Sequence, residues 1–175
     1  MIKINLGCGK RNFGKDWIHI DGGGWKHLDS NDIIDFRYKN IDIIYASHLI
    51  GYFDREEIVP ILKKWKSKLK KKGVLRLATP DFSQICKLYK KFPLRAFLGP
   101  LYGKMKMKNK IIYHKTVYDK DSLTKLLKKV GFKNIKEWNH KKVSHGDFDD
   151  HSQAYLPHMD KENGALLSLN LQCIK

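Results

Sequence analysis

The stretch Ile2-Lys3-Ile4-Asn5-Leu6-Gly7-Cys8-Gly9-Lys10 decides the fold of this chain. It is a short apolar run that stops at Gly-Cys-Gly, which is typical of a buried strand followed by a tight turn. Two glycines one residue apart let the backbone turn sharply and approach a ligand closely, because neither carries a Cβ atom. A second apolar run, Trp17-Ile18-His19-Ile20, ends in Asp21. Open α/β sheets hold a nucleoside with such a turn and such an acid, whose carboxylate accepts hydrogen bonds from ribose hydroxyls.

These residues resemble the class I S-adenosylmethionine-dependent methyltransferases, whose first strand and turn run apolar-Asp/Asn-Leu-Gly-Cys-Gly before an acid at the end of strand two. Within that family they resemble a small, poorly characterised group with the pattern NLGCGK…W.HID, often associated with bacterial surface-saccharide pathways. The full GxGxxG fingerprint is absent, because Asn12 holds the third glycine position. The resemblance implies that the turn and the acid bind S-adenosylmethionine through Asn5, Gly7, Cys8, Gly9 and Asp21.

Two further segments add candidate site residues. Residues 33–36, Ile-Ile-Asp-Phe, predict a short third strand. In the family a carboxylate there often contacts the adenine amino group, so the resemblance offers Asp35 or Asp32 for this contact. We assign the adenine to Asp35, which directly follows the apolar pair, and to Phe36, and we interpret Asp32 as a turn or cap residue. Residues 42–48 resemble the family's fourth strand and end in Ala-Ser-His. Because ligands of open α/β sheets lie outside the carboxyl ends of strands, we expect Ser47 and His48 to face the site.

The remaining pattern completes an α/β fold. Residues 11–16 leave no room for the helix that most methyltransferases place between strands one and two. Apolar residues at helical spacing predict helices over 54–73 and 119–130, and a third helix is predicted over 82–91. Strands are predicted over 74–79, 134–138 and 166–174. We therefore expect a Rossmann-like, doubly wound, mostly parallel sheet with one antiparallel C-terminal strand and a shortened first helix.

A chain of this length is expected to form one methyltransferase domain over residues 1–175. Between about residues 92 and 116 the regular pattern fades and proline and glycine recur. Methyltransferases commonly place substrate-recognition insertions here, so we interpret this segment as a lid or substrate loop. Tyr113 and His114 at its end are candidate substrate contacts, with ordinary surface positions as the alternative.

Residues 145–151, His-Gly-Asp-Phe-Asp-Asp-His, concentrate histidine and aspartate. Such side chains bind divalent metals, but their spacing matches neither an EF-hand nor a zinc motif, and we assign no metal. We instead expect the loop to reach the edge of the active site, where His145 or His151 accepts a proton. A merely solvated loop is the remaining alternative.

Composition limits the class of protein. The chain has 42% hydrophobic residues, no apolar stretch long enough to span a bilayer and no recognisable signal peptide. Its three cysteines, at positions 8, 86 and 173, are widely spaced, which favours free thiols and a cytoplasmic location. The net charge is +17, yet only five of the 35 basic residues are arginines. Proteins that grip phosphates usually use more arginine, so nucleic acid is our second choice of partner.

The resemblance implies methyl transfer from S-adenosylmethionine to a small-molecule or saccharide acceptor, by in-line attack. His48, His145 and His151 are the candidate bases, because an unperturbed histidine pKa suits that role. One alternative is an RNA methyltransferase that uses the basic surface. Another is an inactive cofactor-binding module, since the first helix is missing and Gly51-Tyr52 replaces a Glu and a His frequent in relatives.

Overall fold

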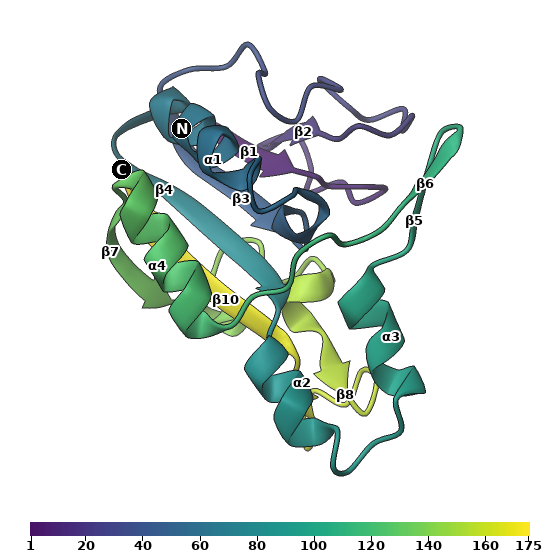
Figure 1. The fold of residues 1–175 in the computed structure, drawn as a ribbon. Coiled ribbons are helices and arrows are strands. Elements are labelled where there is room, and N and C mark those ends of the chain that lie inside the picture. Colours follow the sequence, from purple (N-terminus) through teal and green to yellow (C-terminus); the bar gives the residue numbers. More distant parts are fainter.

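The computed structural model describes all of residues 1–175, and Figure 1 shows how its elements are arranged. The strands are β1 (Lys3–Leu6), β2 (Ile18–Ile20), β3 (Ile41–Ser47), β4 (Leu69–Pro80), β5 (Met105–Met107), β6 (Lys110–Ile112), β7 (Lys133–Glu137), β8 (Tyr155–Leu156), β9 (Ala165–Leu166) and β10 (Ser168–Ile174). The α-helices are α1 (Ile58–Lys68), α2 (Phe82–Leu88), α3 (Arg95–Tyr102) and α4 (Lys120–Val130). Short 3₁₀ helices are η1 (Ile50–Tyr52), η2 (His140–Lys142) and η3 (His151–Gln153).

A six-stranded sheet in the order β2-β1-β3-β4-β10-β7 forms the centre of the protein. The pairs β1–β2, β1–β3 and β3–β4 are parallel, whereas β10 runs antiparallel to both β4 and β7. The predicted mostly parallel sheet with one antiparallel C-terminal strand is therefore confirmed. Because β1, β2, β3 and β4 run in the same direction, their carboxyl ends meet at one edge.

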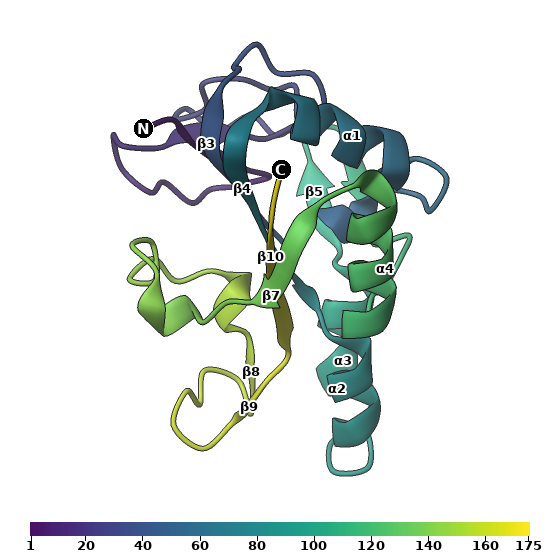
Figure 2. The same cartoon turned by 90° about the vertical axis from the view of Figure 1, so that its left-hand side faces the viewer.

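The two faces of the sheet are covered differently. Helices α1 and α4 lie on one face, and the chain between β7 and β8 lies on the other (Figure 2). Residues 10–17 contain turns but no helix, so the predicted shortening of the first helix is confirmed. Phe13 and Trp17 from this loop pack on Tyr45 and Trp138, a buried aromatic cluster that takes the place of a helix.

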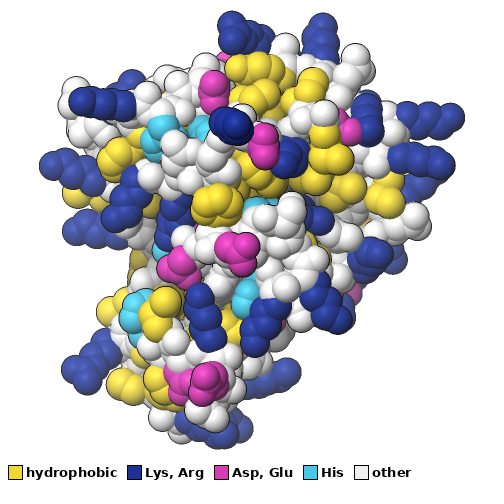
Figure 3. All heavy atoms as spheres, turned by 180° about the vertical axis from the view of Figure 1, so that it is seen from behind, with side chains coloured by type: hydrophobic (Ala, Val, Ile, Leu, Met, Phe, Trp, Pro, Cys, Tyr) yellow, Lys and Arg dark blue, Asp and Glu magenta, His cyan; other side chains and the backbone are white.

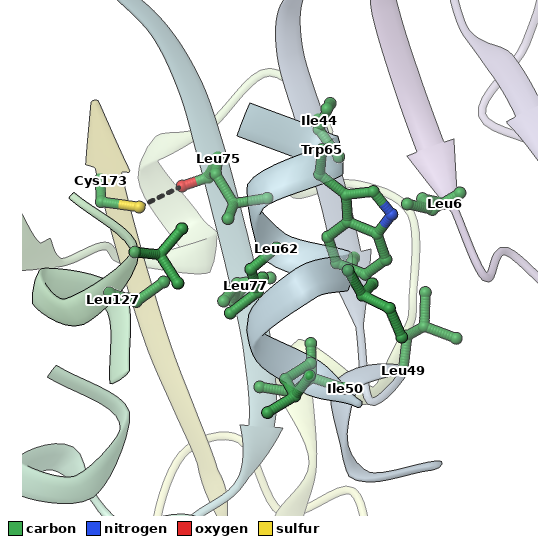
Figure 4. Close-up of a cluster of buried hydrophobic side chains, with 14 of the residues drawn as sticks. Leu6, Ile44, Leu49, Ile50, Leu62, Trp65, Leu75, Leu77, Leu127 and Cys173 are labelled. Atoms are coloured by element: carbon green, nitrogen blue, oxygen red, sulfur yellow. Dashed lines mark hydrogen bonds between the residues drawn. The ribbon is translucent and has the colours of Figure 1, made fainter. Parts of the chain in front are cut away.

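The main core lies between the sheet and helices α1 and α4. Apolar residues of α1 recur at helical spacing, and Leu62 and Trp65 point from the helix toward the sheet (Figure 4). Trp65 is fully buried, and its indole N–H donates to the Ile33 carbonyl at 2.9 Å. This single side chain therefore joins α1, the sheet and the loop after β2.

The helix predicted over residues 54–73 is too long at both ends, because α1 spans only Ile58–Lys68. Leu69 is extended and buried, and it lies opposite Ile41 of β3. The next residue, Lys70, forms an ion pair with Asp42, which also belongs to β3. Pairing with β3 thus begins four residues before Gly73, where the sequence pattern placed the end of the helix.

The third strand predicted over residues 33–36 does not form. Asp32 instead caps a turn by accepting hydrogen bonds from the backbone N–H groups of Ile34 and Asp35, at 2.9 and 2.7 Å. Phe36 then enters the core, with 1% of its surface exposed. The Asp32 side chain thus accepts the backbone N–H groups that a strand partner would otherwise bind, and the Phe36 ring anchors the segment in the core. The segment is therefore stable without pairing to another strand.

The segment between residues 92 and 116 contains α3 and the β5–β6 hairpin (Figure 1). It is tied to the loop after β3, because Lys115 donates its backbone N–H to the Gly51 carbonyl at 2.7 Å. Its role as a lid stays a prediction, as does the single-domain organisation. None of the helices is both long enough and apolar enough to cross a membrane.

Candidate functional site

A cavity of about 570 Å³ lies at the carboxyl ends of β1, β2 and β3. Its far wall comes from α3, the β5–β6 hairpin and the chain between η3 and β9. The lining includes Asn5, Gly7, Cys8, Gly9, Arg11, Asp21, Trp25, Ile33, Ser47, His48, Gly103, Met107, His114, Asp150, His151 and His158. Its place at the strand ends is where open α/β sheets bind ligands.

The glycine turn shapes the floor of this cavity. Gly7 and Gly9 have φ values of +70° and +57°, which glycine adopts without strain. A Cβ atom on Gly7 would lie 2.8 Å from the Leu49 side chain, whereas one on Gly9 would meet nothing within 4 Å. The positive φ of Gly7 and its closeness to Leu49 both favour glycine there, and Gly9 leaves open space above the turn.

Asp21 joins the turn to the end of β2. Its side chain is 6% exposed, and one carboxylate oxygen accepts the Gly9 N–H at 2.8 Å while the other accepts the Gly23 N–H at 2.7 Å. Each carboxylate oxygen can accept a second hydrogen bond. The acid is therefore held rigidly and still has capacity for two hydroxyl groups.

Three buried polar atoms in the lining have no partner in the protein. One is Nε2 of His114, described below, and the other two stand at strand ends. These two are Nδ2 of Asn5, in β1, and Oγ of Ser47, at the end of β3. An unpaired buried polar atom costs about 1–3 kcal/mol, so such atoms are uncommon away from ligand sites. Their presence at two adjacent strand ends indicates a cavity built for a polar ligand.

Cys8, between the two glycines, has a structural role in this turn. It is 4% exposed, and burial, reinforced by the nearby Asp21 carboxylate, raises the pKa of its thiol to about 12. The thiol therefore stays protonated at neutral pH and is a poor nucleophile. Cys8 lines the cavity as a small uncharged side chain.

His48 and His151 lie side by side at the cavity, with ring centroids 5.1 Å apart. His48 follows β3 directly, and its backbone N–H donates to the Ala78 carbonyl of β4 at 2.8 Å. Burial, together with the neighbouring His151, His114 and Arg11, lowers the pKa of His48 well below 6.5. His48 is therefore neutral at pH 7 and able to accept a proton.

His114 is a third histidine of the lining, and its ring orientation can be deduced. Its Nδ1 lies 3.1 Å from the Pro100 carbonyl, which can only accept, so Nδ1 carries the hydrogen. Nε2 then has a free lone pair, and it is buried without a partner.

Two glycines make room for the His114 ring. A Cβ atom on Gly103 would collide with this ring, and one on Gly51 would crowd it. The Gly51 that departs from the family pattern thus makes room for His114. Tyr113, its predicted companion, is 46% exposed and lies outside the lining.

The adenine contacts predicted for Asp35 and Phe36 do not agree with the structure. Asp35 forms ion pairs with Lys64 and Lys68 of α1 at 2.7 and 2.9 Å, outside the cavity. Hydrogen bonds from Lys64 and then from Lys68 lower the pKa of Asp35 to about 2. Phe36 lies in the core. Because the segment forms a capped turn instead of a strand, Ile33 is its only residue that lines the cavity.

His145 is likewise absent from the cavity, contrary to prediction. It is 2% exposed, stacks on Phe13 and accepts a hydrogen bond from Arg76 at 3.0 Å. Burial and the Arg76 charge lower its pKa to about 4. The loop turns between its two histidines, so that His145 joins the aromatic cluster and His151 reaches the cavity.

The protein contains no group of three His, Cys, Asp or Glu side chains placed to hold a metal ion.

Sequence patterns gave no signal for several lining residues. Trp25 and His158 come from irregular segments for which no site role was predicted. Met107 lies in the segment interpreted as a lid or substrate loop, and its hairpin reaches Gly22. A second cavity, of about 590 Å³, lies beside β7 and β10. None of the buried unpartnered polar atoms belongs to its wall, whereas three of the five belong to the first cavity. The first cavity is therefore the better ligand site.

No family model matches the chain, and no curated protein matches it. Solved structures with a similar fold include a SAM-dependent methyltransferase from Archaeoglobus fulgidus, with 17% identity, 99% of this chain and 85% of that chain covered, and a TM-score of 0.58. A possible histamine N-methyltransferase from Thermotoga maritima has 14% identity, 99% and 81% coverage and a TM-score of 0.57. The 1,6-didemethyltoxoflavin-N1-methyltransferase of Burkholderia thailandensis, solved with S-adenosylhomocysteine, has 9% identity, 99% and 70% coverage and a TM-score of 0.55. The chain therefore has the fold of the S-adenosylmethionine-dependent methyltransferases.

Proposed function

We propose that this protein is an S-adenosylmethionine-dependent methyltransferase that acts on a small-molecule or saccharide acceptor. The observation that carries the proposal is the position of Asp21. This carboxylate stands at the end of β2, is fixed by the Gly9 and Gly23 N–H groups and retains free acceptor capacity toward the cavity. The methyltransferase fold supports the same conclusion.

The residues of the cavity fit the cofactor. Asn5 offers an unsatisfied N–H donor, and Gly9 leaves open space over the turn. Asp21 accepts the ribose hydroxyls in this proposal. Ile33 and Trp25 take the place first assigned to Asp35 and Phe36, because their apolar surfaces line the cavity and offer a purine a place to stack.

When bound, S-adenosylmethionine supplies a methyl group on a positively charged sulfur, ready for in-line attack by an acceptor atom. The main contribution of the protein is then to position the acceptor. For a hydroxyl acceptor, His48 takes up the proton, because its ring is neutral at pH 7 and lines the cavity. His151, beside it, helps to hold the acceptor. An amine acceptor that is already nucleophilic needs no base.

RNA is the second candidate acceptor, favoured by the charge of the protein. The net charge is +17, and on the face shown in Figure 3 lysine and arginine side chains project around the outline. Such a surface attracts polyanions, and the attraction falls steeply with salt. Turnover of an uncharged small acceptor has no comparable dependence on salt, so the two acceptor classes can be separated.

The test is transfer of a labelled methyl group from S-adenosylmethionine to panels of saccharides, small alcohols and amines, and RNA. Formation of S-adenosylhomocysteine together with label in one panel supports the proposal. His48→Gln should lower turnover of a hydroxyl acceptor by about 10²- to 10⁴-fold, the range for loss of a general base, with cofactor binding retained. Cofactor binding without transfer to any panel would leave the inactive binding module as the better description.

A further inference from the structure

Two polar residues on β10, Ser168 and Asn170, are each 5% exposed and have no part in the mechanism above. They are two positions apart on a strand, so their side chains lie on the same face of the sheet. Asn170 is paired with Ala78 of β4, whose carbonyl binds the His48 backbone N–H. The strand pairing therefore brings both side chains next to His48.

The hydrogen bonds can be followed from a group that cannot donate. The Ser152 carbonyl, in η3, lies 3.0 Å from the side-chain amide of Asn170. A carbonyl only accepts, so the atom that faces it is Nδ2, and Oδ1 of Asn170 points the other way. The opposite orientation would set two acceptors against each other inside the protein.

Oδ1 of Asn170 lies 3.0 Å from Oγ of Ser168. Because Oδ1 carries no hydrogen, the hydrogen of this bond is that of the Ser168 hydroxyl. A serine hydroxyl has a single hydrogen, so toward any other neighbour Ser168 can act only as an acceptor.

That other neighbour is Nε2 of His48, at 3.3 Å from Oγ of Ser168. Nε2 must therefore carry a hydrogen, and in a neutral ring Nδ1 is then the free lone pair. We propose that Ser168 and Asn170 are positioning residues that hold His48 in its Nε2–H tautomer and keep Nδ1 as the proton acceptor. The catalytic consequence rests on the proposed function, but the tautomer itself does not.

The far end of this chain of hydrogen bonds is fixed as well. The Ser152 backbone N–H donates to one oxygen of Asp150 at 2.8 Å, and the other oxygen accepts from the Tyr45 hydroxyl of β3. Ser152 and Asp150 are both buried, so little water competes for these bonds. The Ser152 carbonyl, which sets the order of donors and acceptors, is thus fixed through Asp150 to Tyr45 of β3, the strand that His48 follows.

The test is nuclear magnetic resonance of the protein labelled with ¹⁵N in its histidine rings, at a pH where His48 is neutral. The His48 signals are assigned by their loss in His48→Gln. In the wild type we expect a protonated Nε2 and an unprotonated Nδ1. In Asn170→Leu the Ser168 hydroxyl is free to donate to Nε2, so the Nδ1–H form should appear. Ser168→Ala should also give a mixture, whereas Ser168→Thr should keep the wild-type form.

Gln172→Leu is the matched control, because Gln172 lies on the same face of β10 but accepts its hydrogen bond from Arg76. Its His48 signals should not change. An Nδ1–H ring in the wild type, or unchanged populations in folded Ser168→Ala and Asn170→Leu, overturns the proposal. Where methyl transfer to a hydroxyl is measurable, Ser168→Ala should lower kcat about tenfold, the upper range for one neutral hydrogen bond, and Ser168→Thr should restore it. Absence of transfer in the wild type would contradict the proposed function, while the tautomer alone decides this inference.

Discussion

Replacing Asp21 by alanine should remove most of the affinity for S-adenosylmethionine. The carboxylate is buried, and its two oxygens are held by the Gly9 and Gly23 N–H groups. In the proposed role it would therefore meet a ribose hydroxyl without having to reorganise. A hydrogen bond to a charged group contributes about 1.5–3 kcal/mol, so the loss of one such bond weakens binding by about 10- to 150-fold. Loss of a second ribose bond would add to this.

The same substitution should also destabilise the protein, because two backbone N–H groups lose their acceptor. Each unsatisfied donor costs about 1–3 kcal/mol when water cannot reach it. Asp29→Ala is the matched control for this effect. Asp29 lies on the same loop and accepts the backbone N–H of His19 in β2 at 2.8 Å, but it does not line the cavity.

Titration calorimetry with S-adenosylhomocysteine, together with urea unfolding, separates the two effects. Asp29→Ala should lower the free energy of unfolding and leave the Kd close to the wild-type value, whereas Asp21→Ala should change both. Asp21→Ala that is folded and binds within about twofold of the wild type would refute the assigned role. If both variants lost affinity equally, the loss would come from a destabilised loop, and the assigned ribose contact would not be supported.

Three further predictions follow from burial, charge and backbone conformation. If His48 is the base, turnover of a hydroxyl acceptor should be constant above pH 6.5 and fall only at lower pH, because the neutral ring is the active form and its pKa is lowered. A pH profile in which turnover is half lost at a pH above 6.5 would contradict this. Gly103→Ala should raise the KM of the acceptor, because a Cβ there collides with His114 and the residue has φ +53°; an unchanged KM in steady-state kinetics would contradict this. Trp65→Ala should lower the free energy of unfolding by about 3–5 kcal/mol, measured by urea titration, because this side chain is fully buried; a loss below about 1 kcal/mol would refute the packing argument.

The sequence allowed the central sheet to be predicted because its signals are local. An apolar run that stops at Gly7 is typical of a short buried strand with a sharp turn, and the acid that ends the next run is as direct a signal. The structure brings the turn, Asp21, Ser47 and His48 to one cavity. These residues stand at strand ends, and their side-chain direction follows from the strand that precedes them.

Side chains of irregular segments could not be placed in this way. His145 and His151 belong to one short loop, yet one enters the aromatic cluster and the other lines the cavity. No periodicity distinguishes them, because the direction of each depends on partners more than 60 residues away in sequence, such as Arg76. Asp35 was misplaced for a related reason: two lysines of α1 hold it outside the cavity.

The most direct test of the account is titration of the wild-type protein with S-adenosylmethionine and S-adenosylhomocysteine, with adenosine as the reference ligand. We expect one site per chain, micromolar affinity for both compounds, and much weaker binding of adenosine, which lacks the methionine portion. In the proposed site that portion would lie against the unpaired Asn5 amide and the open space above Gly9. A natively folded protein that binds neither compound would contradict the central claim. The cavity at the strand ends would then serve another ligand.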